Sequence, residues 1–189
     1  MMKKILTLLL VVLALAVAGC DSGTALPGGG SSNPGTSASP GKAVEQPAPE
    51  KIKTVDFTVY RVPKNGNLKL LPEKVHYAIG NKTMAEGALE ALVKTEPTSK
   101  TMQNLFPAGT VVKGVTVKDG IAYANFNQAF AKKGQGSYNE NMMVNAIVAT
   151  LTELPEIKKV QILVEGKKIA TISGHLDLLD PLPRNKTML

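Results

Sequence analysis

The 189-residue sequence contains a single cysteine, two histidines, no tryptophan and few other aromatic residues. One cysteine cannot form an intrachain disulfide, so any folded part must rest on its apolar core. A structural zinc site needs about four ligands, which the cysteine and histidine content does not supply. The pattern Gly134-x-Gly136 lacks the Gly-Lys-Ser/Thr continuation of a phosphate-binding loop. Few aromatic rings are available to stack on carbohydrate. These absences argue against an enzyme and predict neither cofactor nor metal.

The N-terminal apolar stretch is too short to cross a membrane. Residues 5–17 number 13, broken only by Thr7, whereas a helix needs about 20 residues to span a bilayer. The stretch follows Lys3 and Lys4 and precedes small residues, an order that is typical of a secretory signal peptide. We therefore predict a signal peptide at residues 1–19.

The predicted signal peptide is followed directly by Cys20. The run Ala18-Gly19-Cys20 resembles the lipobox of bacterial lipoproteins. The resemblance implies diacylglycerol on the Cys20 sulfur, cleavage before Cys20 and usually a third acyl chain on the new amino group. A cysteine thiolate is a strong nucleophile, and two acyl chains hold a protein stably on a membrane where one does not. We expect attachment through Cys20 to the extracytoplasmic face of the bacterial cell membrane. The alternatives are an ordinary secretion signal with an incidental thiol, or a short membrane anchor.

The next segment is poor in residues that could build a core. Of residues 21–50, 16 are Gly, Pro or Ser, and none is aromatic. Such a segment cannot bury enough apolar area to offset the entropy lost on ordering. We predict that residues 20–50, the lipidated Cys20 included, form a disordered tether with a span of about 30 Å as a random coil. The alternative is a linker that only lets the chain clear the export and processing machinery.

Residues 51–189 are long enough for one domain. We predict the domain at 51–180 and a loose, proline-rich tail at 181–189. This part carries 19 Lys and Arg against 12 Asp and Glu, a net charge of +7. Outside a cell, that charge favours anionic wall polymers or lipid headgroups as partners and disfavours nucleic acid. A solvated basic surface without a partner is the alternative.

Periodicity and turn residues predict the elements of the domain. Two helices are expected after the capping boxes Thr83–Glu86 and Ser137–Glu140. Strands are expected at 55–61, 68–79, 111–117, 121–126, 160–164 and 169–172. Two amphipathic helices need an apolar sheet face to bury their stripes. We therefore expect an α+β fold: a two-layer sandwich with a mostly antiparallel sheet and two helices packed on one face, in the order ββαββαββ.

Few side chains offer chemistry. His175 and Asp177 alternate and could share one side of a strand, but no third metal ligand lies near them in the sequence. His76 is expected to be a surface or edge residue of a strand. Ser137 and Glu140 are expected to cap the second helix rather than to act in catalysis. No catalytic residue is predicted.

The domain resembles the GerMN domain, also called the sporulation and spore germination domain, over most of residues 55–175. The residues that carry the resemblance most specifically are Phe106-Pro107-Ala108-Gly109-Thr110, Val115, Val117, Asp119-Gly120, Ala122, Asn125-Phe126 and Phe130. The chain departs from the family pattern at two positions. Glu96 stands where the family often has Gly before Pro97, and Asn125 stands where it often has Asp.

The resemblance implies a domain for which no catalytic residues are known. The family's best-known member is a lipoprotein needed for sporulation, and its two domains resemble ring-forming components of the channel apparatus between mother cell and forespore. We therefore expect a membrane-anchored interaction or assembly domain in sporulation, germination or envelope assembly, with a homo-oligomer or an envelope protein as partner. The alternative is a binding module for anionic wall polymer or peptidoglycan. An extracellular hydrolase is a third hypothesis.

Overall fold

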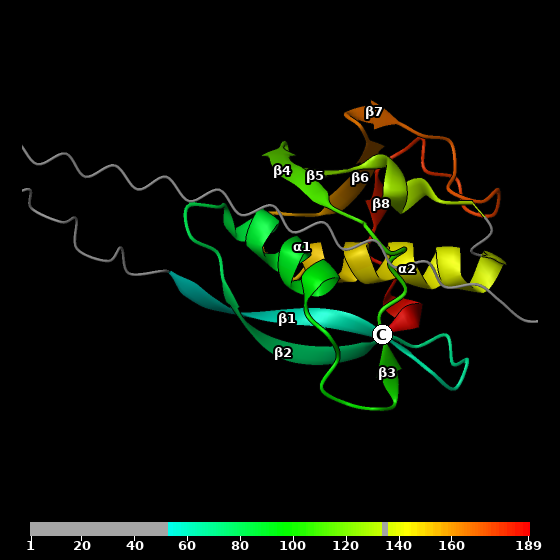
Figure 1. Ribbon diagram of the computed structural model, residues 1–189. Helices are drawn as coiled ribbons and strands as arrows, with labels where there is room; N and C mark the ends of the chain where they lie inside the picture. The colour runs from blue at the N-terminus through cyan, green and yellow to red at the C-terminus, as the bar shows by residue number, and fades with distance from the viewer. Residues whose placement is uncertain (1–52, 134–135) are drawn as a thin grey trace, which may run out of the picture. The chain divides into compact units, whose positions relative to one another are not determined.

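The computed structural model describes residues 53–133 and 136–189, and the predicted signal peptide, Cys20 and tether lie outside these residues. The helices and strands follow one another along the chain as Figure 1 shows. Their bounds are β1 Thr54–Pro63, β2 Leu71–Ala78, α1 Met84–Lys94, β3 Met102–Gln103, β4 Val112–Lys118, β5 Ile121–Phe126, the 3-10 turn η1 Gln128–Ala131, α2 Gly136–Leu151, β6 Lys159–Val164, β7 Lys167–Lys168, β8 Leu182–Pro183 and the 3-10 turn η2 Lys186–Met188.

The described strands form two sheets. One has three strands in the order β2-β1-β3, and the other has five, in the order β4-β5-β6-β7 with β8 also paired to β6. All the pairings are antiparallel except that of β5 with β6, which is parallel. The α+β class, the mainly antiparallel pairing and the predicted element order are confirmed, with β3 and β8 as added two-residue strands.

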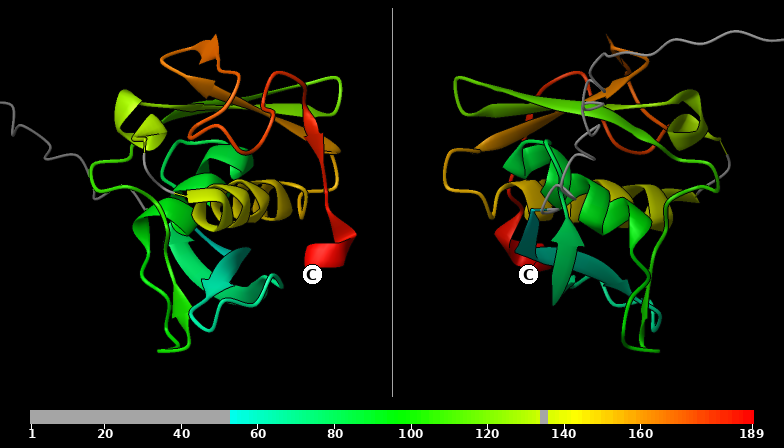
Figure 2. Two further views of the ribbon diagram at one scale, coloured as in Figure 1. Left: turned by 90° about the vertical axis from the view of Figure 1, so that its right-hand side faces the viewer. Right: turned by 60° about the vertical axis from the view of Figure 1, so that its left-hand side comes forward.

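The layer arrangement differs from the expected single sheet with helices on one face. Both helices lie between the two sheets, and each contacts strands of both (Figures 1 and 2). The physical reason is visible in α2, whose buried residues occupy most of the helix circumference, from Met142, Met143 and Val144 to Val148 and Ala149. A helix that is apolar over most of its circumference needs covering layers on more than one side.

The β4–β5 hairpin forms where the sequence predicts it. Asp119 and Gly120 both have positive φ values, 53° and 75°. Two consecutive positive φ values are the geometry of the tight hairpin turn that matches strand twist. Val115, Ala122 and Ala124 on this hairpin are buried in the core. The turn therefore fixes the pairing register in which these side chains face the core.

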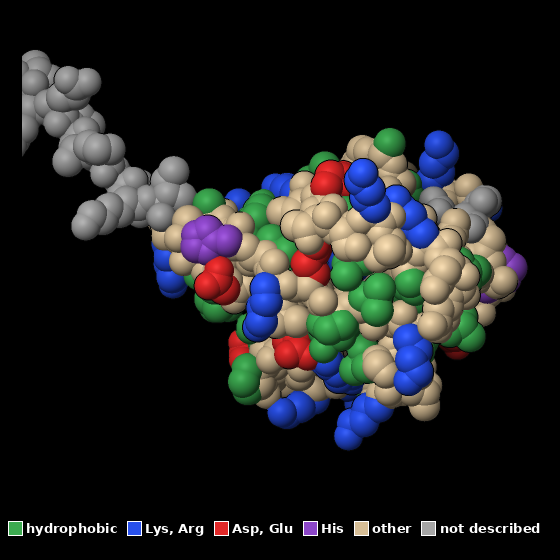
Figure 3. Space-filling model, turned by 90° about the horizontal axis from the view of Figure 1, so that it is seen from below, with side chains coloured by type: hydrophobic (Ala, Val, Ile, Leu, Met, Phe, Trp, Pro, Cys, Tyr) green, Lys and Arg blue, Asp and Glu red, His purple; other side chains and the backbone are tan. Residues whose placement is uncertain are grey.

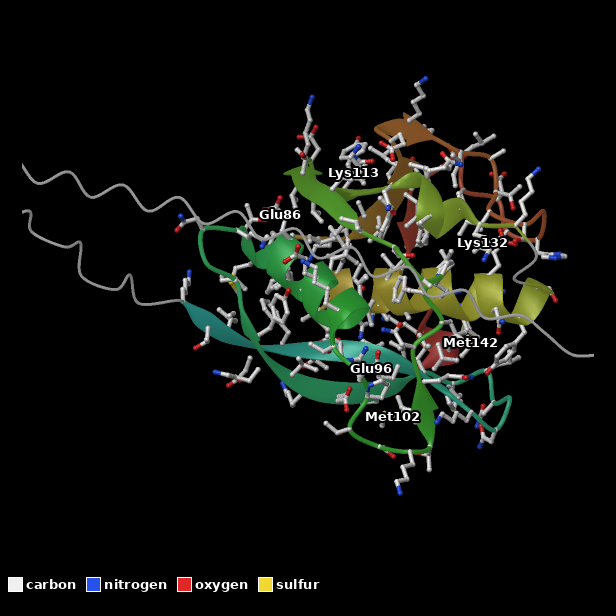
Figure 4. The ribbon with its side chains drawn as sticks, viewed as in Figure 1. Glu86, Glu96, Met102, Lys113, Lys132 and Met142 are labelled. Atoms are coloured by element: carbon white, nitrogen blue, oxygen red, sulfur yellow. The ribbon has the colours of Figure 1, made fainter. Side chains whose placement is uncertain are left out.

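The N-terminus of α1 is capped as predicted. The Glu86 backbone N–H donates to Thr83 Oγ1 at 3.2 Å, and the Thr83 N–H donates to Glu86 Oε2 at 3.0 Å. This reciprocal pair is a capping box, which satisfies donors that the first helical turn leaves free. Glu86 therefore lies at the start of α1, on the side that faces β4 (Figure 4).

The last predicted strand has the wrong bounds: β7 lies at Lys167–Lys168 and not at 169–172, and pairing after the Glu165–Gly166 turn ends at Lys168. Beyond it the chain leaves the sheet, because the Ile172 N–H bonds a side chain of α2 instead of a neighbouring strand. The tail at 181–189, expected to be loose, is instead packed. Its β8 pairs with β6, and the Leu70 N–H donates to Met188 O at 2.7 Å. The tail thus runs from the five-stranded sheet along α2 to the three-stranded sheet (Figure 2).

Replacing Gly87 with alanine should destabilise the domain by about 1–3 kcal/mol through overpacking. A Cβ at Gly87 would lie 2.4 Å from Ile79 Cγ2 and 3.1 Å from Phe57 Cζ, both buried. The clash outweighs the roughly 1 kcal/mol that alanine gains over glycine in a helix. Urea unfolding measures the change. In the Ile79→Ala background the same replacement should cost clearly less, and an equal cost in both backgrounds would disprove the clash.

Candidate functional site

Of the residues considered above for chemistry, His76 lies apart from the others, and Glu140 meets His175 only through the His175 backbone N–H. Cys20 lies outside the described residues. His76 is exposed on the edge strand β2, as expected, and its Nδ1 lies 2.7 Å from Asp56 Oδ1. His175 and Asp177 are exposed on the segment after β7, where Asp177 Oδ1 accepts the Leu179 N–H.

The described residues contain neither a cluster of metal ligands nor a membrane-spanning helix. Across 53–133 and 136–189, no three His, Cys, Asp or Glu side chains gather closely enough to hold a metal ion. Among the helices of those same residues, none is both long and apolar enough to cross a membrane. The absence of cofactor and metal stays a prediction.

Glu140 is the most deeply buried carboxylate of the domain, with no exposed surface. It lies in the first turns of α2 and binds the segment after β7. Its Oε1 accepts the Thr171 hydroxyl at 2.7 Å and the Ile172 N–H at 3.0 Å, and its Oε2 accepts the His175 N–H at 3.2 Å. This arrangement differs from the predicted capping box, because Ser137 lies inside α2 and Glu140 reaches across to another segment. Glu140 therefore fixes residues 171–175 against the helix.

The electrostatics of Glu140 follow from these bonds. Burial by itself raises the pKa of the Glu140 carboxyl, but the hydrogen bonds from Thr171, Ile172, Ser173 and His175 outweigh burial and hold the pKa below its usual range. A carboxylate that accepts several hydrogen bonds is stabilised in its charged form. The charged Glu140 carboxylate thus has a structural role, and its hydrogen-bond donors all come from the protein itself.

A second buried ion pair ties β1, β2 and α1 together. Arg61, 1% exposed, donates from Nε to Glu73 Oε2 at 2.8 Å and from Nη1 to Leu92 O at 2.8 Å. Its Nη2 donates to Thr95 Oγ1 at 2.6 Å. The other Glu73 oxygen accepts the N–H and the hydroxyl of Thr98 at 2.7 and 2.5 Å. The guanidinium thus also binds a carbonyl at the C-terminal end of α1, where a cation is favoured.

The Arg61–Glu73 pair was not predicted from the sequence, although the sequence contains a signal for it. Arg61 falls on the same side of the alternating first strand as Phe57 and Val59, which are core residues. A charged side chain on an apolar strand face must be paired when it is buried. The partner could not be named, because Glu73 lies on the following strand at an unknown register.

The C-terminal segment, residues 181–189, is held to α2 by Arg184. Its Nη1 donates to Ala149 O at 2.8 Å, and its Nη2 donates to the Tyr60 hydroxyl at 2.7 Å and contacts Glu153. The guanidinium carbon also lies 5.0 Å from the centre of the Tyr60 ring, a distance at which cation–π attraction operates. Arg184 therefore fixes where the segment runs beside α2.

This path leaves a groove of about 490 Å³, called here the α2–β8 groove. One wall is the exposed side of α2, and the other is the C-terminal segment. The residues that line it are Asn141, Asn145, Leu176, Leu182, Pro183, Arg184, Asn185 and Lys186. Its volume is that of ordinary ligand pockets, and it combines carboxamide, cationic and aliphatic side chains without a carboxylate.

The residues that carry the family resemblance lie in and next to the five-stranded sheet. Phe126 and Phe130 stack with ring centres 4.1 Å apart, and Phe106 lies 6.4 Å from Phe130. Asn125 Oδ1 accepts the Gly166 N–H at 2.8 Å. The pattern of the family described as "Germane: Sporulation and spore germination" matches residues 58–170, more than half of the chain. The chain belongs to the Germane family.

Relatives of the Germane domain agree in sequence and fold. The spore germination protein GerM of Bacillus subtilis is 31% identical over 144 residues, which are 72% of this chain and 37% of GerM. The chain thus spans little more than a third of that relative.

Solved structures show the same fold. The tandem GerMN domains of B. subtilis GerM match with a TM-score of 0.57 and 27% identity, covering 70% of this chain and 47% of that one. The first GerMN domain alone matches with a TM-score of 0.56 and 28% identity, covering 69% of this chain and 98% of that one. A candidate lipoprotein of Clostridium perfringens, at 20% identity and a TM-score of 0.50 over 74% of this chain and 93% of that one, shows the fold alone.

The two departures from the Germane pattern have clear structural positions. Glu96 is exposed just after α1, next to Pro97, so the change from glycine is accommodated in solvent. The Asn125 carboxamide accepts the Gly166 N–H, a role that either a carboxamide or a carboxylate oxygen can fill. This hydrogen bond joins β5 to the turn after β6.

Proposed function

We propose that this chain is a lipid-anchored, extracytoplasmic protein whose Germane domain binds other proteins without catalysis, in sporulation, germination or envelope assembly. The observation that carries the proposal is the family match over residues 58–170, together with relatives described as sporulation and spore germination proteins. The Ala18-Gly19-Cys20 run and the Gly/Pro/Ser-rich residues that follow support the anchor and the tether.

The chemistry of the domain supports a binding role. Its buried charged side chains, such as Arg61, Glu73 and Glu140, are satisfied by partners within the fold. A general acid or base must be within reach of a substrate proton, and these groups are buried and occupied. The surface charge gives less support to the wall-polymer alternative, since Lys and Arg are scattered on the face of the three-stranded sheet (Figure 3).

Cross-linking in intact membranes tests the binding role. The full chain, carrying an affinity tag at the C-terminus, is cross-linked in cells and purified. We expect a discrete adduct, either a homo-oligomer or one envelope protein, that is identified by mass spectrometry. A chain that stays monomeric without a reproducible adduct would contradict the proposal, and retention on purified cell wall that falls with salt would favour the wall-polymer alternative instead.

Replacing Cys20 with serine should abolish the membrane attachment of the mature protein. Serine cannot form the thioether that carries the lipid, and the polypeptide alone offers little membrane affinity. Fractionation with immunoblotting should show the wild type in the membrane pellet and the variant either in the medium or as an unprocessed precursor. Ser22→Ala is the matched control. It should leave the amount of protein in the membrane pellet unchanged. Mature Cys20→Ser protein that remained membrane-bound would show that another feature anchors the chain.

A further inference from the structure

The α2–β8 groove has unused hydrogen-bonding groups on its helical wall. Asn141 and Asn145 are one turn apart on α2, and Asn145 Nδ2 donates to Asn141 O at 2.9 Å and to Asn141 Oδ1 at 2.7 Å. Among the described residues, Asn141 Nδ2 and Asn145 Oδ1 make no further hydrogen bond. One is a donor and the other an acceptor, which is the pair of groups that a peptide bond complements.

The opposite wall supplies charge and aliphatic surface. Arg184 is paired with Glu153, whereas Lys186 forms no ion pair with any residue in the described part of the chain. The lining therefore offers one cation that is available to a ligand and no carboxylate to repel an anion. Leu176, Leu182 and Pro183 contribute aliphatic surface to the lining.

These features distinguish between ligand classes. The backbone of a phosphate-rich wall polymer has neither an amide N–H nor an aliphatic side chain, and a glycan ligand would lack an aromatic ring to stack on, since none lines the groove. A peptide supplies N–H and C=O groups, aliphatic side chains and carboxylates together. Resting on the proposed binding function, we propose that the α2–β8 groove binds a short acidic peptide segment of a partner protein.

The test uses the full chain purified in detergent and fluorescence anisotropy. The probe is a fluorescein-labelled, C-terminally amidated hexapeptide of alternating Leu and Asp, and the reference peptide has Asn in place of Asp. We expect the acidic peptide to bind about fivefold more tightly than the neutral one at low salt, as one exposed charge contact of about 1 kcal/mol would give. Equal binding of both peptides, or no binding of the acidic one, would overturn the proposal.

Three variants test whether the peptide binds in the groove. Lys186→Glu should weaken binding of the acidic peptide about tenfold, since it turns attraction into repulsion, and it leaves the Arg184 contacts intact. Lys100→Glu makes the same charge change on an exposed residue outside the groove and should leave affinity unchanged. Asn145→Ala should weaken the binding of the acidic and the neutral peptide to the same extent. Equal losses in the two lysine variants would show that the peptide responds only to net charge.

A competition arm separates the remaining outcomes. Poly(glycerol phosphate) is added to the complex of the wild-type chain with the acidic peptide. If the polymer displaces the peptide when its phosphate groups are less concentrated than the carboxylate groups of the peptide, the groove binds a wall polymer and the proposal is rejected. Failure of the peptide to bind, while cross-linking in membranes still captures a protein partner, would reject the groove and leave the proposed function standing.

Discussion

Replacing Arg61 with alanine should lower the free energy of unfolding by about 3–5 kcal/mol, because it leaves a buried carboxylate without its cation. Glu73 has a side chain that is 6% exposed and would keep only its bonds to Thr98. The carbonyl of Leu92 would lose the Arg61 donor near the end of α1. Urea unfolding followed by circular dichroism measures the loss.

The control for Arg61→Ala distinguishes loss of the buried ion pair from loss of one positive charge. Lys53→Ala removes an exposed cation just before β1 and should change stability by no more than about 0.5 kcal/mol. The double variant Arg61→Met/Glu73→Leu should recover much of the loss, since apolar replacement of both members removes the unpaired charge. A cost for Arg61→Ala no greater than that for Lys53→Ala would show that the pair does not hold β1, β2 and α1 together.

Replacing Glu140 with glutamine should cost about 2–3 kcal/mol near neutral pH, the worth of hydrogen bonds to a charged group. The amide keeps the size of the carboxylate but cannot accept on both sides. The pKa of the Glu140 carboxyl is held below its ordinary value of 4.5, so the stabilisation by its charged form is present above about pH 4.5 and is lost as pH falls through the lower folded pKa.

The pH profile makes the Glu140 prediction specific. The difference in stability between the wild type and Glu140→Gln should be constant from about pH 6 to 8 and should narrow as the pH falls below 4.5. Glu73, Glu90 and Glu153 also have lowered pKa values, so both proteins lose stability in acid and only the difference is diagnostic. Glu156→Gln, an exposed change, is the control. A difference that does not depend on pH would contradict the charged hydrogen-bond network.

The features that the sequence predicted well are those whose cause is local. The β4–β5 hairpin follows from Asp119-Gly120, and the start of α1 follows from Thr83 and Glu86, because each pattern contains both partners of its own interaction. The family resemblance rested on the same part of the chain, and the match over 58–170 confirms it.

The features that the sequence predicted poorly depend on partners far along the chain. The Ser137–Glu140 spacing fits a capping box, but the Glu140 carboxylate accepts hydrogen bonds from residues 171–175 instead of capping the helix. No local pattern distinguishes these two uses. The tail at 181–189 is similar, since its packing depends on Arg184 meeting Glu153.

The second sheet layer could have been recognised from α2. In the sequence, Met143, Ile147 and Leu151 form one apolar stripe at helical spacing, and Val144 and Val148 lie beside that stripe and are equally buried. Apolar residues that extend well beyond one face of a helix indicate more than one covering layer. The α2–β8 groove could not be predicted, because it exists only where the C-terminal segment passes α2.

The mass of the N-terminal peptide of the mature protein tests the central claim most directly. The full chain is expressed in a Gram-positive host, extracted from membranes and analysed by mass spectrometry after proteolysis. We predict that the mature protein begins at Cys20 and that its N-terminal peptide carries diacylglycerol on the sulfur, with or without a further acyl chain on the amino group. An N-terminal peptide that begins elsewhere, or that contains Cys20 as an unmodified thiol, would contradict the account of a lipid-anchored binding domain.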